Sequence, residues 1–264
     1  MNKIIFGRYI PVESFLHKMD PRAKLIITIL FIAVVFLANN GITYALLGLF
    51  TLLTIFSSKI PFRFLLGGFK LLFWLIIITF FLHIFFTKGG NVIVEIGAFK
   101  VYEHGLRQGI FISLRFFFLI IMTGLLTLTT TPIEITDGME SLLKPLKRFR
   151  FPVHEFALMM SIALRFIPTL MDETDKIMKA QVARGVDFTQ GSLKERAQSF
   201  IPLLIPLFIN SFKRAEELAI AMEARGYRGG EGRTKYRLLK WGIRDTAAFI
   251  ILLVLTTALI VFRS

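Results

Sequence analysis

Five long apolar runs follow one another along the chain, and an extended polar-containing region separates the fourth run from the fifth. A helix needs about 20 residues to cross the hydrocarbon core of a bilayer, and a few fewer where the membrane adapts around it. Each run can therefore cross a membrane as a helix. The predicted spans cover residues 25–38, 42–56, 64–86, 109–131 and 246–262.

Two of the connections between these runs have recognisable patterns. Asn39-Asn40-Gly41 joins the first and second runs and is typical of a tight turn, so these two helices are predicted to form a hairpin. Residues 91–95 and 98–102 resemble two short strands on either side of Gly97, and they predict a small β-hairpin.

The region before the fifth run contains two long helical patterns. One extends from near Pro152 to Arg184 and the other from about Leu193 to Arg225, with apolar residues at steps of three and four. A shorter helix over residues 135–146 precedes them. Each long pattern begins apolar and ends polar, which we interpret as a lever reaching from the membrane into the cytoplasm. Prolines inside these patterns predict kinks at Pro168, Pro202 and Pro206.

Both long patterns end in the same three residues, Ala183-Arg184-Gly185 and Ala224-Arg225-Gly226. Glycine readily adopts the left-handed conformation that caps a helix, and a cation in the last turn complements the helix dipole. One copy is explained fully as an ordinary helix end. Two copies at the ends of similar helices favour a second role, because an exposed arginine can form a bidentate bond with a carboxylate of a partner.

Charge and composition agree with a membrane protein. The chain is 55% hydrophobic and has a net charge of +14, and the large majority of its 32 lysines and arginines lie before the first run, in the second connection or between residues 133 and 244. The positive-inside bias then predicts that the N-terminus and the region of the two long helices are cytoplasmic. This bias also explains the positive charge without nucleic-acid binding. With no cysteine, disulfides and thiolate metal sites are excluded.

Several classes of function lack the residues that they require. No Gly-x-x-x-x-Gly-Lys-Ser/Thr loop is present to hold nucleotide phosphates, and no Gly-x-Ser-x-Gly elbow is present. Glu216 and Glu217 have no histidine nearby and form a poor metal site. A self-sufficient secondary carrier remains the alternative, although its usual inverted repeats and converging polar groups within the spans are not evident. We predict no enzyme activity and no cofactor.

The spans, the two long helices and their Ala-Arg-Gly ends resemble the transmembrane T component of energy-coupling factor transporters, which are ABC-type importers of vitamins and transition metals in prokaryotes. The segment from Ser14 to Leu25, with Asp20-Pro21-Arg22 inside it, is similar to the N-terminal signature of that family. The resemblance covers essentially the whole chain.

This resemblance implies a scaffold with two kinds of protein partner in the prokaryotic plasma membrane. The two Ala-Arg-Gly ends would bind two ABC ATPase subunits, which hydrolyse ATP and move the helices. A membrane-embedded S component would bind the substrate and contact the apolar face of the second long helix. The residues of that predicted face are Leu203, Leu204, Leu207, Phe208 and Phe212.

The sequence thus predicts an all-α, polytopic membrane helical bundle. It has about five transmembrane spans, two long kinked amphipathic helices and a shorter helix. Residues 1–131 are predicted to form an N-terminal membrane domain of four spans, residues 132–244 a cytoplasmic coupling domain, and residues 245–264 a C-terminal span.

Overall fold

The computed structural model describes residues 9–61, 64–65, 70–96, 99–188, 190–229 and 238–263. They form two compact units, which are described separately. One contains residues 1–142 and 238–264, and the other contains residues 143–237. The first unit has helices α1 (Pro21–Val35), α2 (Gly41–Ser58), α4 (Lys70–Phe86), α5 (Glu103–Thr129), α6 (Pro132–Leu143) and α10 (Ile243–Val261), and strands β1 (Val92–Ile96) and β2 (Phe99–Tyr102). The second has the 3₁₀ helix η1 (Lys144–Phe149) and helices α7 (Val153–Ala183), α8 (Leu193–Ser199) and α9 (Ile201–Ala224).

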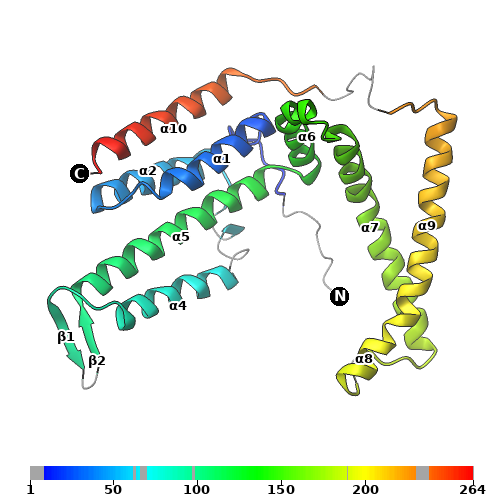
Figure 1. Cartoon of the computed structure of the whole chain (residues 1–264), viewed down its shortest axis with the longest axis horizontal. Coiled ribbons are helices and arrows are strands. Elements are labelled where there is room, and N and C mark those ends of the chain that lie inside the picture. The colour runs from blue at the N-terminus through cyan, green and yellow to red at the C-terminus, as the bar shows by residue number, and fades with distance from the viewer. Residues whose placement is uncertain are drawn as a thin grey trace. The chain divides into compact units, whose positions relative to one another are not determined.

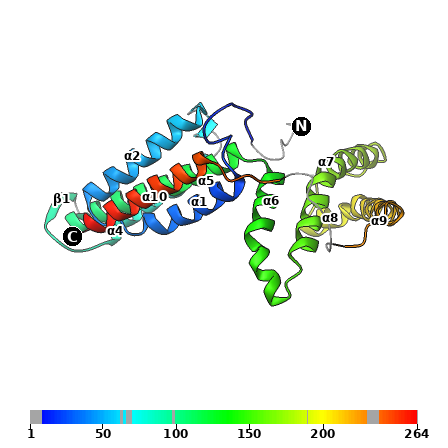
Figure 2. The same cartoon turned by 90° about the horizontal axis from the view of Figure 1, so that it is seen from above.

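The first unit is a bundle of apolar helices with α5 packed against α1, α2 and α4, while α10 packs against α1 and α2 (Figure 1 and Figure 2). Its core is a cluster of apolar side chains that includes Phe31, Leu47, Ile121 and Leu259, all fully buried. Large apolar side chains also cover the outside, as expected for helices that have lipid as their solvent.

Length and composition make α2, α5, α7 and α10 candidate membrane spans, with residues 72–86 of α4 as a shorter apolar helix. The chain is therefore a polytopic helical membrane protein, as predicted. Helices lie at all five predicted spans, although α1 has only 15 residues. The presence of α7 among the candidates differs from our interpretation of it as a boundary helix.

The predicted hairpin between α1 and α2 is present. The side chain of Asn40 accepts a hydrogen bond from the backbone N–H of Thr43, and the Thr43 hydroxyl accepts one from the backbone N–H of Asn40, which caps the start of α2. Nδ2 of Asn39 donates to the carbonyl of Arg263 at 2.7 Å, and Nδ2 of Asn40 donates to that of Phe262 at 2.6 Å. The turn therefore also holds the end of α10.

The predicted β-hairpin is confirmed as an antiparallel pair of β1 and β2. Gly97, which we placed at its centre, lies outside the described residues.

The predicted short helix over residues 135–146 has the wrong bounds. It begins earlier because the Thr131 hydroxyl and the Glu134 carboxylate cap each other's backbone N–H groups at the start of α6. It ends as an α-helix at Leu143 because Pro145 has no N–H to donate and disfavours the α conformation of the residue before it. The 3₁₀ helix η1 follows it and contains the basic residues Lys147 and Arg148 in its last turn.

The second long helix is also interrupted. Phe200 ends α8 and begins α9, and Pro202 lies in the first turn of α9. Proline at this position cannot donate to the carbonyl of Gln198, so it marks the helix start that we had interpreted as an interior kink. Pro168 and Pro206 lie inside α7 and α9 as predicted.

The two compact units divide the chain after residues 142 and 237, and α6 belongs to the first unit with the apolar helices. A side chain at Gly138 of α6 would lie 3.0 Å from Cδ1 of Leu25, so glycine permits the close approach of α6 to α1. The functional division at residues 131/132 and 244/245 stays a prediction.

Candidate functional site

The two long helices of the second unit form an antiparallel pair joined through α8. Near the end of α7, Nε2 of Gln181 donates to the carbonyl of Pro202 at the start of α9, at 3.2 Å. Further along, Nδ2 of Asn210 donates to Oε1 of Glu173 at 2.8 Å, and Arg214 forms an ion pair with the other oxygen of that carboxylate at 3.5 Å. As residue numbers rise along α9, its partners on α7 fall, which defines antiparallel pairing.

The antiparallel pairing places the Ala-Arg-Gly ends at opposite ends of the helix pair (Figure 1). The 24 residues of α9 extend about 36 Å at 1.5 Å per residue, which sets the approximate separation of the two ends. The unit therefore presents one antiparallel helix pair with an arginine at each end. The interpretation of each helix as a lever that extends from the membrane stays a prediction.

The two ends have the same backbone hydrogen bonds. At the end of α7, Gly185 N–H donates to the Val182 carbonyl at 2.9 Å and Val186 N–H donates to the Gln181 carbonyl at 3.0 Å. These two bonds define a Schellman cap, with Arg184 as the C-cap residue and Gly185 in the left-handed region at φ +88°.

The end of α9 repeats this cap. Gly226 N–H donates to the Glu223 carbonyl at 2.8 Å and Tyr227 N–H donates to the Met222 carbonyl at 3.0 Å. Arg225 is the C-cap residue and Gly226 has φ +74°. The predicted capping role of both glycines is thus confirmed, and the two arginines occupy equivalent positions.

Both ends are open to a partner. All six residues of the two Ala-Arg-Gly ends are exposed. A Cβ added to Gly185 or Gly226 would meet no atom within 4 Å, so the requirement for glycine there is conformational. Within the described part of the chain, neither Arg184 nor Arg225 has a carboxylate partner. Each guanidinium is free to bind a carboxylate of another protein.

The predicted apolar face of α9 is only partly exposed. Leu204, Phe208 and Phe212 are 44%, 60% and 73% exposed and recur every four residues, so they form one stripe. Leu207 is half-buried and Leu203 is buried at 5% exposure. Two of the five predicted residues, Leu203 and Leu207, are therefore not part of the exposed stripe.

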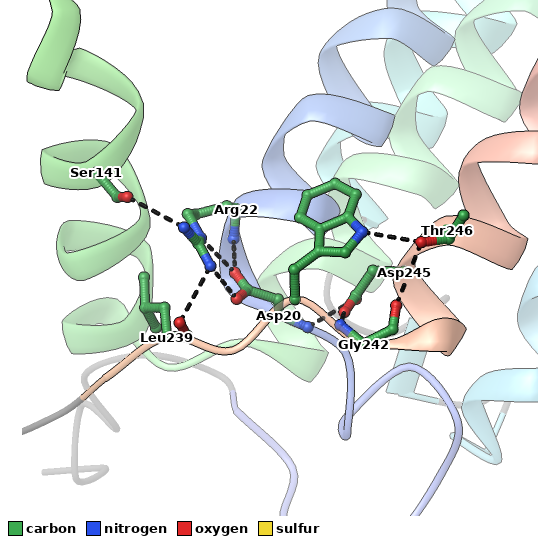
Figure 3. A network of polar contacts seen from close by, with 8 residues as sticks. Asp20, Arg22, Ser141, Leu239, Gly242, Asp245 and Thr246 are labelled. Carbon is green, nitrogen blue, oxygen red and sulfur yellow. Dashed lines mark hydrogen bonds and ion pairs between the residues drawn. The ribbon is translucent and has the colours of Figure 1, made fainter.

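A polar network in the first unit joins segments from both halves of the sequence (Figure 3). The carboxylate of Asp20, fully buried, accepts from Nη2 of Arg22 at 2.8 Å and from its Nε at 3.0 Å. The same guanidinium donates to the Leu239 carbonyl at 3.2 Å and to the Ser141 hydroxyl at 3.5 Å. Asp245, which is buried, accepts the backbone N–H of Asp20.

The position of this network in the chain is informative. The polypeptide leaves the first unit after residue 142 and returns to it at residue 238. Arg22 therefore holds the chain next to both connections, through Ser141 on one side and Leu239 on the other.

Comparison with known proteins identifies the family. Residues 12–236 match the family described as "CbiQ: Cobalt transport protein". The energy-coupling factor transporter transmembrane proteins EcfT of Bacillus subtilis (strain 168) and Listeria innocua are 62% and 57% identical to the chain over 264 residues, which is the whole of each protein. EcfT of Streptococcus thermophilus is 54% identical, again over all of both chains. The chain belongs to this family. It is the transmembrane T component of an energy-coupling factor transporter, a non-catalytic subunit.

The sequence located the two arginine ends of this T component, but it did not indicate their relative position. The segment around Asp20-Pro21-Arg22 was recognised as similar to the family signature, but no structural role was predicted for it. Aspartate directly before proline is a helix-start signal, and it could have predicted that the Asp20 side chain caps α1 by accepting from the backbone N–H of Arg22. The partners Leu239 and Asp245 carried no comparable signal.

Proposed function

We propose that this T component is the scaffold of an importer, and that its two Ala-Arg-Gly ends bind two ABC ATPase subunits. The observation that carries the proposal is the pair of identical Schellman caps, each presenting an exposed arginine on a rigid helix end. A guanidinium held in this way forms bidentate bonds with a carboxylate at little entropic cost, because its backbone is already ordered.

The separation of the two ends supports two binding sites. About 36 Å is the distance scale of two neighbouring domains, and the intervening helices are continuous between the ends. Movement of two ATPase subunits toward each other would apply force to both ends of the pair formed by α7 and α9. The chain contains no nucleotide-binding loop of its own, so the hydrolysis of ATP belongs to those partners.

The exposed stripe of Leu204, Phe208 and Phe212 supports a contact with a membrane-embedded S component that binds the substrate, a vitamin or another micronutrient. Aromatic and leucine side chains at this exposure suit an apolar partner surface. The distribution of lysine and arginine supports a cytoplasmic location for the N-terminus and for the helix pair, in the prokaryotic plasma membrane.

Charge reversal at both helix ends tests the proposal. We expect R184E/R225E to insert into the membrane and to lose the co-purifying ABC ATPase subunits and substrate uptake. The matched control is K176E/K213E, which reverses two exposed cations on the same helices at least eight residues from the arginine at each end. Retention of both ATPase subunits by R184E/R225E at the level of the control would refute the docking role.

A second pair of variants separates the two kinds of partner. F208S/F212S removes the most exposed part of the apolar stripe and leaves both arginines in place. We expect it to retain the ATPase subunits and to lose the S component. If F208S/F212S instead loses the ATPase subunits and retains the S component, the stripe contacts the ATPase subunits and the proposed S-component contact is wrong.

A further inference from the structure

A cleft of about 680 Å³ opens between α7 and α9 next to the arginine end of α9. On α7 it is lined by residues that share one helical face, and on α9 by the last turns and the residues after the cap. The lining residues that carry the argument are Leu158, Phe166, Met222, Arg165, Arg225 and Arg228.

The cleft combines three cations with an apolar floor. Arg165, Arg225 and Arg228 are exposed, and no carboxylate is among the residues that line the cleft. In the described part of the chain, none of the three guanidinium groups has an acidic partner. Three like charges around one cleft repel one another, so an anionic group that enters it gains from all three.

The floor of the cleft continues along the helix pair. Ile162, Phe166, Leu218 and Met222 also line an apolar cavity of about 410 Å³ between the same helices. A void of this size lined by half-buried apolar side chains is typical of a surface that a partner fills. The occupant therefore needs apolar side chains as well as carboxylates.

The two helix ends differ at this point. Three residues after Arg184 comes Asp187, whereas three residues after Arg225 comes Arg228. The end of α7 thus has a carboxylate where the end of α9 has a third guanidinium for its cleft. Equivalent backbone caps consequently present different charge patterns to their partners.

We propose that the cleft lined by Arg165, Arg225 and Arg228 binds an acidic, partly apolar segment of one ABC ATPase subunit, beyond the contact made by the helix end itself. This inference rests on the proposed docking function. The ATPase is favoured as the occupant because Arg225 belongs both to the cleft and to the proposed docking end, so the two surfaces are continuous. Because of this additional contact, the end of α9 prefers a partner segment with acidic residues more strongly than the end of α7 does.

Photo-crosslinking in the assembled transporter tests the cleft. A photoreactive residue replaces Ser161, which lines the cleft, or Val182 or Ile220, which are exposed near the two ends. We expect the probe at position 161 to capture an ATPase subunit. R165Q/R228Q should lower this capture about tenfold, as the loss of a charged hydrogen bond implies, and leave capture at position 182 unchanged. K194Q/K213Q is the matched control, because both lysines are exposed and outside the cleft.

The outcomes separate the two proposals. If the probes at positions 182 and 220 capture no ATPase, the docking function fails. If they capture ATPase while position 161 captures only phospholipid, or only residues 230–237 of this chain, the cleft proposal is overturned and docking stands. Equal capture at position 161 in the wild type and in R165Q/R228Q also overturns it. If capture of the ATPase at position 161 falls in R165Q/R228Q and not in the control K194Q/K213Q, the cleft proposal is supported.

Discussion

The backbone N–H of Asp20 donates a hydrogen bond of 2.8 Å to Oδ1 of Asp245, although the two residues are 225 positions apart in the sequence. Asp245 uses its other oxygen to accept the backbone N–H of Gly242 at 2.8 Å, which caps the start of α10. One buried carboxylate thus joins α1 and α10, the first and last helices of the first unit (Figure 3).

Removal of the Asp245 carboxylate is expected to destabilise the first unit. D245A deletes a helix cap and leaves the N–H of Asp20 without an acceptor, and together these cost about 2 kcal/mol. Thermal unfolding of the detergent-solubilised protein measures the effect. D172N, which changes an exposed aspartate of α7, is the control. A melting temperature for D245A equal to that of D172N would show that the link contributes nothing.

Replacement of Arg22 is expected to destabilise the fold more than replacement of a typical partly exposed side chain. R22Q leaves the fully buried Asp20 carboxylate without its cation, which costs about 3 kcal/mol. R22K should recover only part of this, because an ammonium group cannot match the bonds of the guanidinium to Asp20, Leu239 and Ser141. The double variant D20N/R22Q should be more stable than R22Q alone in the same unfolding experiment. If the loss of stability in D20N/R22Q equals the sum of the losses in D20N and in R22Q, the two residues are not coupled and this account is contradicted.

The two cap glycines provide a conformational test. G185A and G226A add no steric clash, since a Cβ there meets no atom within 4 Å, but each places alanine at a positive φ. The expected cost is about 1 kcal/mol for each cap, with faster hydrogen exchange in the last turn of α7 or α9. G41A is the control, because a Cβ at Gly41 is equally free and its backbone does not have a positive φ. Unchanged exchange in both cap variants would remove the argument that the arginines are held rigidly.

Acid is expected to loosen the segment before α1 through His17. Its Nε2 donates to the Ile10 carbonyl at 2.9 Å, its Nδ1 accepts from the Ser14 hydroxyl at 2.7 Å, and burial lowers the pKa of the imidazole. The fold therefore favours neutral His17. Its contribution is present above the unfolded pKa of about 6.5 and is lost as the pH falls from there toward the folded pKa.

Thermal unfolding between pH 7.5 and pH 5 compares the wild type with H17Q. We expect the wild type to lose more stability than H17Q over this interval. Parallel pH profiles would show that His17 does not titrate differently in the folded and unfolded states.

Most of the helices were predictable because apolar length and periodicity are local properties of the sequence. The Asn40 turn, the glycine caps and the β-hairpin are local signals too, and all of them were confirmed. The break at Phe200 was missed because Pro202 can kink a helix or begin one, and the pattern does not distinguish the two.

The relative position of the two arginine ends was not predictable from these local signals. It depends on contacts such as those of Gln181 with Pro202 and of Glu173 with Asn210, which lie between helices. The same holds for Asp20 and Asp245. Long-range polar pairs of this kind leave no periodic trace in one sequence.

The central claim, that both helix ends are covered by ATPase subunits, is tested most directly by cysteine accessibility. The chain has no cysteine, so A183C, A224C and the control D172C each introduce a single exposed thiol. We predict that a maleimide reagent labels all three thiols rapidly in the isolated T component. In the assembled transporter, A183C and A224C should be protected while D172C still reacts. Rapid labelling of A183C and A224C in the assembled transporter would contradict the account.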